Sequence, residues 1–413
     1  MTYWPEIGAT MRAPRLRFDP AVPSRAHTHP FIGLRQHGAY SLGALEGESP
    51  RLLLVYPTAL AAQAQALSQK LLGGAGTYPG FARLFGLPDQ FAANLAEHEL
   101  QIGAMSIPEM REAYERELRE WAQAPGREDP DLAIVVVPGS DPWELETPYY
   151  AAKSFFASRA IPSQMVTSEL LNDQRQLGWS LANIALASFA KLGGIPWVVD
   201  AREDEGDLVI GIGRAEVAHG SERRRIFGYA VAFIHNGANL DTASFTPAAD
   251  ESSYRERLTE AITHALEAER SVDEEPRRII IHLAKRTGGT EVEAARAALE
   301  RSAHASLPVA FLRIDDTSLF EFINTSVDTY APPKGLCVRL GERRALLQSE
   351  GETKYGPSRR PLLLELDRRS TVGPEELGRL TLQAFRLAHA NWRGFNSRSK
   401  PVTLLYGEQL AEL

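Results

Sequence analysis

The first half of the chain alternates between short apolar runs and longer stretches in which apolar positions recur every three or four residues. Apolar runs bounded by polar or turn residues predict buried parallel strands, and the longer period predicts helices. The expected strands span residues 51–57, 131–139, 161–166 and 195–200, and the expected helices span 59–74, 109–124, a stretch around Tyr149, and 172–192. Strands and helices that alternate at this spacing indicate a doubly wound α/β domain. We expect its pocket residues to follow strand ends or to sit on the adjacent helices, where such sheets place ligands.

Beyond residue 196 the pattern changes to several strands in succession, followed by strand–helix pairs. The expected strands span residues 207–218, 223–235, 238–245, 277–286, 307–314, 336–341, 343–349 and 360–367, and the expected helices span 254–269, 290–301 and 375–390. Taken alone, this pattern indicates only a second domain of mixed α/β type.

Length, charge and cysteine content narrow the class of protein. The 413 residues are enough for two or three domains. Cys337 is the single cysteine, which excludes disulfides and cysteine-rich zinc clusters and suits a reducing cytoplasm. The formal net charge of −8 argues mildly against nucleic-acid binding, although a basic channel can lie on an acidic chain or a partner can supply one. The amino-terminal residues lack the apolar core of a signal peptide, and no apolar run approaches the ~18 residues of a membrane span, so we expect a cytoplasmic location.

Four polar side chains between Thr147 and Asp200 can converge on one anion. Tyr149 and Lys153 are four residues apart and share one helix face. Gln164 is the polar residue of the extended run IPSQMV, and Lys191 ends a helix just before a glycine pair. Two cations, an amide and an aromatic ring are the groups that a 5′-phosphorylated nucleotide requires for phosphate binding and base stacking.

Each of these residues also has a purely structural interpretation. Tyr149 can be a half-buried helix tyrosine, and Lys153 a solvated lysine. Lys191 can favour the helix C-terminus and its dipole, and Gln164 can be a loop amide with satisfied hydrogen bonds. Taken one by one, the residues leave both interpretations open, whereas their joint occurrence favours a binding site.

The order Tyr-x3-Lys, IPSQ and KLGG-x-PW resembles the MID domain of short prokaryotic Argonaute proteins. In that family a Tyr-Lys-Gln-Lys set grips the 5′ end of a guide strand. The resemblance therefore implies a guide pocket formed by Tyr149, Lys153, Gln164 and Lys191. It also implies an α/β fold with a Rossmann-like MID domain followed by an RNase H-like PIWI domain. The expected boundaries are 1–38 for an arm packing on the PIWI domain, 39–195 for the MID domain and 196–413 for the PIWI domain.

The same resemblance predicts a PIWI domain without nuclease activity. Catalytic members carry aspartates at two strand ends, where this chain has Gly213 and Ala284. Glu408 stands where catalytic members have their last metal ligand and is also a carboxylate. One ligand cannot hold the two metal ions that such a nuclease requires. We interpret the acidic residues between Asp200 and Asp207 as a solvated loop, and His282 as a packed core histidine. We therefore expect no enzyme activity in this chain.

The carboxyl-terminal stretch NWRGFNSRSKPVT also resembles the family closely. Arg393, Arg398 and Lys400 are candidates for contacts to the nucleic-acid backbone, and a surface basic loop is the alternative. In the family the terminal carboxylate helps to bind a divalent ion at the guide 5′ end. The resemblance thus implies a Mg²⁺ ion shared by Gln164 and Leu413, and hard oxygen ligands suit that ion.

The resemblance implies that the protein recognises nucleic acid through a bound guide strand, as part of prokaryotic antiviral defence. The guide is a short 5′-phosphorylated strand, with RNA commoner in the family than DNA, and the target is complementary invader DNA. The family usually works with a partner that carries an APAZ region and a SIR2, TIR or nuclease effector. The alternatives are a stand-alone guide-dependent nuclease, a two-lobed binding protein for a small solute, and a DNA-binding Argonaute homodimer that needs no partner. The sequence leaves open the effector, the guide type and its first base, and the oligomeric state.

Overall fold

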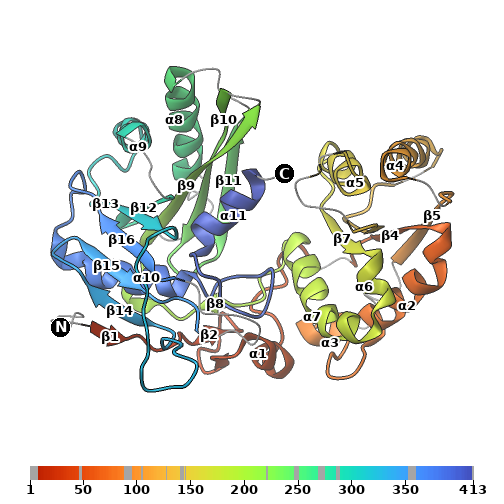
Figure 1. The fold of residues 1–413 in the computed structure, drawn as a ribbon, viewed down its shortest axis with the longest axis horizontal. Coiled ribbons are helices and arrows are strands. Elements are labelled where there is room, and N and C mark those ends of the chain that lie inside the picture. Colours follow the sequence, from red (N-terminus) through yellow and green to blue (C-terminus); the bar gives the residue numbers. More distant parts are fainter. Residues whose placement is uncertain are drawn as a thin grey trace. The chain divides into compact units, whose positions relative to one another are not determined.

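The computed structural model describes residues 8–45, 49–87, 95–103, 106–126, 128–139, 144, 146–219, 222–245, 251–267, 275–284, 289–351 and 360–411. The chain divides into two compact units, which are described separately here (Figure 1). The first unit comprises Leu16–Trp197 and Trp392–Phe395, and the second unit comprises Met1–Arg15, Val198–Asn391 and Asn396–Leu413. Both units are mixed α/β, as the apolar pattern predicts.

The first unit is built on a parallel sheet with the strand order β5-β4-β6-β7. Its strands are β4 (Leu52–Pro57), β5 (Leu95–Leu100), β6 (Leu132–Val137) and β7 (Ser163–Thr167). Every residue of β4 and β6 is buried, because helices cover both faces of these central strands. By contrast, β5 (LAEHEL) is an edge strand with exposed polar positions, so it has no apolar run and the sequence pattern did not predict it.

Helices form a layer on each face of this sheet. They are α1 (Pro30–His37), α2 (Ala61–Gly73), α3 (Phe81–Phe85), α4 (Ile107–Gln123), α5 (Pro148–Ala157), α6 (Ser168–Asn172) and α7 (Gln174–Lys191). α4 and α5 pack on one face, and α2 and α7 lie on the other (Figure 1). The helix predicted at 172–192 is interrupted at Asp173, whose carboxylate accepts hydrogen bonds from the backbone N–H groups of Arg175 and Gln176 and caps α7.

The second unit is built on a mixed sheet of nine strands. In sheet order these are β1 (Gly8–Thr10), β14 (Leu336–Arg339), β15 (Arg344–Leu347), β16 (Leu362–Leu366), β13 (Val309–Asp315), β12 (Arg278–Ala284), β9 (Asp207–His219), β10 (Glu222–Ile234) and β11 (Asn239–Phe245). The central strands β9, β12 and β13 are parallel, and the remaining pairs are antiparallel. The helices are α8 (Glu251–Glu267), α9 (Gly289–Arg301), α10 (Leu377–Leu387) and α11 (Val402–Ala411).

The period of two along β9 builds two cores, one on each face of the sheet. Leu208, Ile210 and Ile212 pack with α8 and α9. Val209, which points to the opposite face, packs in a core that contains α10 and Leu404 of α11. Among the described helices, none combines the length and the apolar character needed to cross a bilayer.

The predicted amino-terminal arm is divided between the two units. β1 pairs with β14 in the second unit, with Ala9 opposite Cys337. The segment that follows belongs to the first unit, where Phe18 and Leu34 are buried and the Phe18 ring packs on Gly33. Residues 16–38 thus differ from the expected arm, because their apolar side chains are buried with the first unit.

The stretch from Asp200 to Asp207 is not a solvated loop throughout. Asp204 and Asp207 are buried, with exposed fractions of 0% and 2%. Arg379 Nη1 donates to Asp204 at 3.1 Å and to Asp207 at 2.5 Å, and Arg386 Nη1 donates to Asp204 at 3.0 Å. The solvated-loop interpretation is therefore wrong for these two aspartates. Their partners come from α10, far along the chain, and form a buried ion-pair network in which each carboxylate has a cation beside it.

α11 packs directly on β9 at Gly211. A β-carbon at Gly211 would overlap the backbone carbonyl of Thr403, so this approach requires glycine. Thr403 Oγ1 also lies 2.8 Å from Nδ1 of His282 on the neighbouring strand β12. His282 is fully buried, and burial lowers its pKa to about 3. The interpretation of His282 as a packed core histidine is confirmed.

We expect Gly211→Ala to destabilise the second unit by roughly 1–3 kcal/mol, because α11 must move away from β9. Gly178→Ala is the matched control: Gly178 lies inside α7 with open space around it, so alanine should stabilise the first unit by about 0.5–1 kcal/mol. Calorimetry of both variants checks the signs. Amide exchange in α11 should accelerate in Gly211→Ala only, and unchanged exchange there would contradict the packing described.

Candidate nucleic-acid interface

Three elements of the first unit carry the four predicted pocket residues. Tyr149 and Lys153 lie one turn apart on α5, Gln164 is the second residue of the edge strand β7, and Lys191 is the last residue of α7. α7 stops there because Gly193 adopts a φ of +85°, which glycine reaches without strain. The glycine pair in the sequence therefore fixes where the Lys191 side chain leaves the helix.

The structure brings three of these side chains together at the start of β7. Lys191 Nζ donates to the backbone carbonyl of Ser163 and to Oε1 of Gln164, each at 2.7 Å. Lys153 Nζ donates to the same Ser163 carbonyl at 3.4 Å. Gln164 Nε2 in turn donates to the Met165 carbonyl at 3.0 Å, which fixes its amide with the oxygen toward Lys191.

Tyr149 lies beside this group and is half-buried. Its ring packs against the core beneath α4 and α5, and it meets the Tyr150 ring edge-on at 5.2 Å. Burial raises the pKa of Tyr149, and the positive charge of Arg393 acts in the opposite direction. The phenol therefore stays neutral, and one flat aromatic ring lies near the cations.

Arg393, which the sequence predicted as a contact to the nucleic-acid backbone, lies near the predicted pocket residues. The segment Trp392–Phe395 belongs to the first unit although its neighbours in the chain belong to the second. Trp392 Nε1 donates to the Trp197 carbonyl at 3.0 Å, and the Phe395 ring packs on the Trp197 and Phe31 rings. Held between these aromatic anchors, Arg393 is exposed and close enough to influence Tyr149, Lys153 and Lys191. The aromatic residues on each side of Arg393 were the available signal.

Lys153, Lys191 and Arg393 form a cluster of positive charges, here called the cation cluster, in which burial and mutual repulsion lower the pKa values of the two lysines. Desolvation, followed by repulsion from Lys153 and Arg393, lowers the pKa of Lys191 to about 7. Desolvation and Arg393 also lower the pKa of Lys153. The charged groups that shift these pKa values are all cations, so an anion bound between them would relieve both the burial cost and the mutual repulsion.

The predicted pocket residues lie on the adjacent helices α5 and α7 and at the start of strand β7. Ser163 and Gln164 begin β7, and Lys191 ends a helix, so the cation cluster is not at the carboxyl ends of the strands. Helix N-termini attract anions through backbone N–H groups, whereas a helix C-terminus carries the negative end of the dipole. Anion binding here must therefore come from side-chain cations.

Gly213 and Ala284, the positions that lack the family's aspartates, lie side by side on adjacent strands, with Gly213 in the middle of β9 and Ala284 at the end of β12. Ile212 and Leu283 are paired on the parallel strands β9 and β12, and Gly213 and Ala284 are the next residues of each strand. Neither side chain can bind a metal ion. Glu408 on α11 accepts hydrogen bonds from Lys400 Nζ at both carboxylate oxygens, at 2.7 and 2.8 Å.

The magnesium ligands implied by the resemblance, Gln164 and Leu413, remain a prediction. Leu413 lies outside the described residues, and Gln164 Oε1 already accepts a hydrogen bond from Lys191. Within the described part of the chain, no group of three or more His, Cys, Asp or Glu side chains is arranged to hold a metal ion. A divalent cation beside Lys153, Lys191 and Arg393 would need further anionic ligands.

The other two predicted contacts to the nucleic-acid backbone, Arg398 and Lys400, differ in their surroundings. Arg398 is exposed, and its backbone N–H donates to the Ala388 carbonyl. Lys400 is largely buried, with Nζ 2.8 Å from Asp316 Oδ2 as well as on the Glu408 carboxylate. Arg398 can therefore reach a phosphate freely, whereas Lys400 is already held by two carboxylates.

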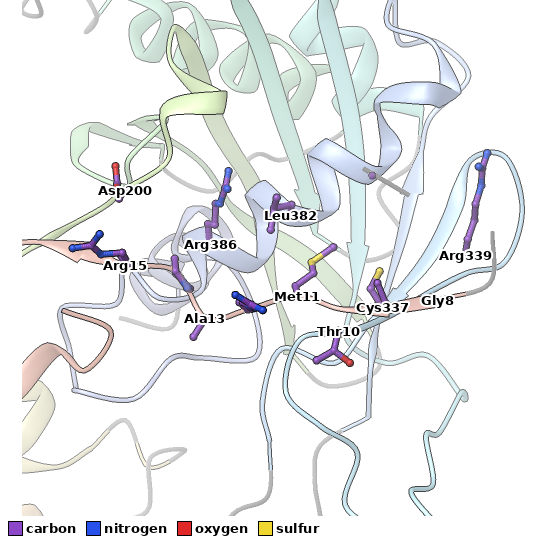
Figure 2. Close-up of a pocket in the computed structure, with 14 residues that line it drawn as sticks. Gly8, Thr10, Met11, Ala13, Arg15, Asp200, Cys337, Arg339, Leu382 and Arg386 are labelled. Atoms are coloured by element: carbon purple, nitrogen blue, oxygen red, sulfur yellow. The ribbon is translucent and has the colours of Figure 1, made fainter. Parts of the chain in front are cut away.

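A cavity of about 450 Å³ lies in the second unit between residues 8–15, β14 and α10 (Figure 2). Met11, Leu382 and Cys337 lie at its centre, and Arg15, Asp200 and Arg386 lie at one end (Figure 2). Arg386 is neutralised by Glu203 and Asp204, so the cationic end of this cavity already has carboxylate partners within the second unit. We therefore place the candidate anion site in the first unit.

Known proteins resemble this chain over most of its length. The Piwi domain model matches residues 142–413, which include all four pocket positions. An Argonaute of Cereibacter sphaeroides is 24% identical over 412 residues, covering 92% of this chain and 52% of the relative. A Piwi protein of Archaeoglobus fulgidus is 25% identical over 290 residues, covering 65% of this chain and 66% of the relative. The chain thus spans about half to two thirds of the length of these curated relatives.

Solved structures share the fold at lower identity. Clostridium butyricum Argonaute, bound to a guide DNA and a 19-mer target DNA, superposes with a TM-score of 0.70 and 17% identity, covering 98% of this chain and 52% of that one. Drosophila Piwi superposes with a TM-score of 0.72 and 17% identity, covering 98% and 53%. Together with the match to the Piwi domain model, these similarities confirm the predicted resemblance: the chain belongs to the Argonaute–Piwi family and has the mixed α/β architecture of its RNase H-like fold.

Proposed function

We propose that this protein holds the 5′-phosphorylated end of a short guide strand at Tyr149, Lys153, Gln164 and Lys191. The observation that carries the proposal is the cation cluster, in which two desolvated lysines and Arg393 repel one another. A terminal phosphate carries about 1.5 to 2 negative charges at neutral pH and supplies acceptor oxygens for several donors. It therefore suits this cluster better than a singly charged ligand.

The neighbouring groups suit the remaining parts of a guide end. The Tyr149 ring offers a face for the first base, and stacking on an aromatic ring is tolerant of base identity. The Gln164 amide is fixed with its oxygen toward Lys191, so its N–H group keeps its bond to the Met165 carbonyl. A Mg²⁺ ion at this end would depend mainly on the guide phosphates for its oxygen ligands.

The tail supplies the next contacts in this proposal. Arg393 extends the cluster along the guide, and Arg398 is exposed and available for a backbone phosphate. Lys400 reaches a phosphate only by releasing Asp316 or Glu408. We therefore infer that Arg393 and Arg398 contact the backbone and that Lys400 mainly fixes the tail.

The bound guide then captures complementary nucleic acid without cutting it. Gly213 and Ala284 lack ligand atoms, and the Glu408 carboxylate is occupied by Lys400. Sequence readout would rest on base pairing, with the protein holding the backbone. The guided nucleic-acid binding follows from family membership, and the Clostridium butyricum relative was solved with both a guide and a target.

The biological consequence in this proposal is antiviral defence in the cytoplasm. A short guide, taken to be RNA from the commoner family usage, selects invader DNA. A partner with an APAZ region and a SIR2, TIR or nuclease effector responds. A DNA-binding homodimer that needs no partner is the alternative. Sedimentation of the chain with and without the product of its neighbouring gene distinguishes the two.

The 5′-phosphate should govern guide affinity. At fixed salt, short RNA and DNA guides with a 5′-phosphate should bind more tightly than the same strands with a 5′-hydroxyl. Lys153→Ala combined with Lys191→Ala should reduce phosphate-guide affinity on the order of a hundredfold or more, because each lost charge-assisted contact contributes roughly 1.5–3 kcal/mol. Binding titrations of the four guides measure this directly.

Lys70→Ala is the matched control for that titration. Lys70 bonds to Gln174 at the start of α7, about 25 Å from Lys191 along the helix, so its loss removes one charge from the same unit. It should leave the phosphate preference unchanged. Equal weak binding of all four guides by the wild type would refute the pocket.

Guide affinity should decline as the pH rises above about 7. The phosphate favours protonated Lys191, so binding raises the pKa of Lys191 above its value of about 7 in the free protein. Affinity should be highest between about pH 6, below which the phosphate loses charge, and pH 7. Above pH 7, binding requires proton uptake by Lys191. Lys191→Arg, which stays charged, should bind with a shallower decline. An identical decline in the variant would show that another group is responsible.

Target strands paired with a bound guide should remain intact. Incubation with Mg²⁺ or Mn²⁺ should give no cleavage by the wild type, since Gly213 and Ala284 offer no side-chain metal ligand. Glu408→Ala should behave identically. Cleavage by the wild type that disappears in Glu408→Ala would instead establish the stand-alone nuclease.

A further inference from the structure

The connection between β13 and β14 carries most of the exposed large hydrophobic side chains that the structure describes. Of the nine large hydrophobic side chains that the structure describes as exposed, five lie in residues 316–334, here called the apolar loop. They are Leu319 (87% exposed), Ile323 (66%), Tyr330 (61%), Phe320 (46%) and Val327 (43%). Clustered exposure of this kind marks an interaction site, whereas isolated exposed hydrophobic residues are ordinary.

The apolar loop is ordered by its own hydrogen bonds. The Asn324 N–H donates to the Tyr330 carbonyl at 3.0 Å, and the Tyr330 N–H donates to the Val327 carbonyl at 3.1 Å. Tyr330 is held at a φ of +54°, a conformation that is uncommon for a bulky residue and that occurs where a surrounding structure maintains strain for function. The exposed side chains are thus presented by a preorganised backbone, which lowers the entropic cost of binding.

Both ends of the loop are fixed to the second unit. Lys400 Nζ lies 2.8 Å from Asp316 Oδ2, Ser318 Oγ donates to the Pro361 carbonyl at 3.0 Å, and Lys334 Nζ donates to Ser397 Oγ at 2.6 Å. The loop therefore rests on residues 397–400, the stretch that contains Arg398.

The charge of the loop determines which kind of partner fits. Asp316, Glu321 and Asp328 are its ionisable groups before Lys334, and Glu321 and Asp328 are exposed. Acidic groups repel phosphate, which disfavours nucleic acid and anionic lipid surfaces. Two copies of the loop facing each other across a twofold axis would place like charges together, which disfavours self-association. An apolar groove rimmed by lysine or arginine complements both features.

We propose that the apolar loop is the docking site for a partner protein that offers an apolar groove with a basic rim. Leu319, Phe320 and Ile323 act as anchors, and Glu321 and Asp328 pair with the rim. This proposal depends on the proposed function in one respect: it identifies the docking partner as the effector protein.

The test uses the full chain co-expressed with the product of its neighbouring gene. The dissociation constant of the complex is measured for the wild type, for Leu319→Ser/Phe320→Ser/Ile323→Ser, and for Glu321→Lys/Asp328→Lys. Trp179→Ser, which alters an equally exposed side chain of the first unit, is the matched control. We expect about a hundredfold weakening for the triple variant, at least tenfold for the charge reversal, and no change for Trp179→Ser.

Guide affinity and unfolding temperature of the same variants separate the two proposals. In the triple variant both should stay at wild-type values, because the substituted side chains are exposed and lie outside the guide pocket. If the wild type binds 5′-phosphate and 5′-hydroxyl guides equally, the proposed function is refuted. The measured affinity for the partner protein is not affected by that outcome. The docking proposal is overturned by a wild-type chain that forms no complex, by undiminished binding of the triple variant, or by weakened guide binding in that variant. It is also overturned if the wild-type chain self-associates through this loop.

Discussion

The repulsion among Lys153, Lys191 and Arg393 is the constraint on which the proposed site depends. Ordinary surface lysines keep their charge because water solvates them, but here burial and neighbouring cations lower the pKa values of both lysines. The Ser163 carbonyl and the Gln164 amide oxygen are dipolar partners that hold the ammonium groups in place without neutralising them. An anion bound among these cations would offset both their mutual repulsion and their desolvation.

The position of the cluster explains why it consists of side chains. The cluster lies at the start of a parallel strand and at the end of a helix, where the helix dipole disfavours an anion. Lysine and arginine side chains supply the positive charge that offsets this dipole. The aromatic anchors Trp392 and Phe395 serve the same purpose, since they place Arg393 beside two lysines that precede it by about two hundred residues or more.

In the second unit, acidic groups are paired with basic groups inside the protein. Asp204 and Asp207 are buried against Arg379 and Arg386, and Glu408 accepts both of its short contacts from Lys400. A carboxylate that is bound to a guanidinium or ammonium group has fewer lone pairs left for another ligand. These ion pairs link α10 and α11 to the rest of the second unit.

The sequence by itself determined the strands that are apolar on both faces, such as β4, β6 and β12, because burial on both sides requires an uninterrupted apolar run. It also placed Tyr149 and Lys153 on one helix face, and the family pattern carried the remaining pocket residues. Only the tertiary structure decided that Arg393 lies near the predicted pocket residues, that Asp204 and Asp207 are buried ion pairs, and that Gln164 lies at the start of β7. The edge strand β5 was not predicted for a local reason, since its exposed polar positions leave no apolar run. The other three share one physical reason: periodicity reports how a segment meets its surroundings, whereas charge pairing, desolvation and sheet position depend on residues far apart in the chain.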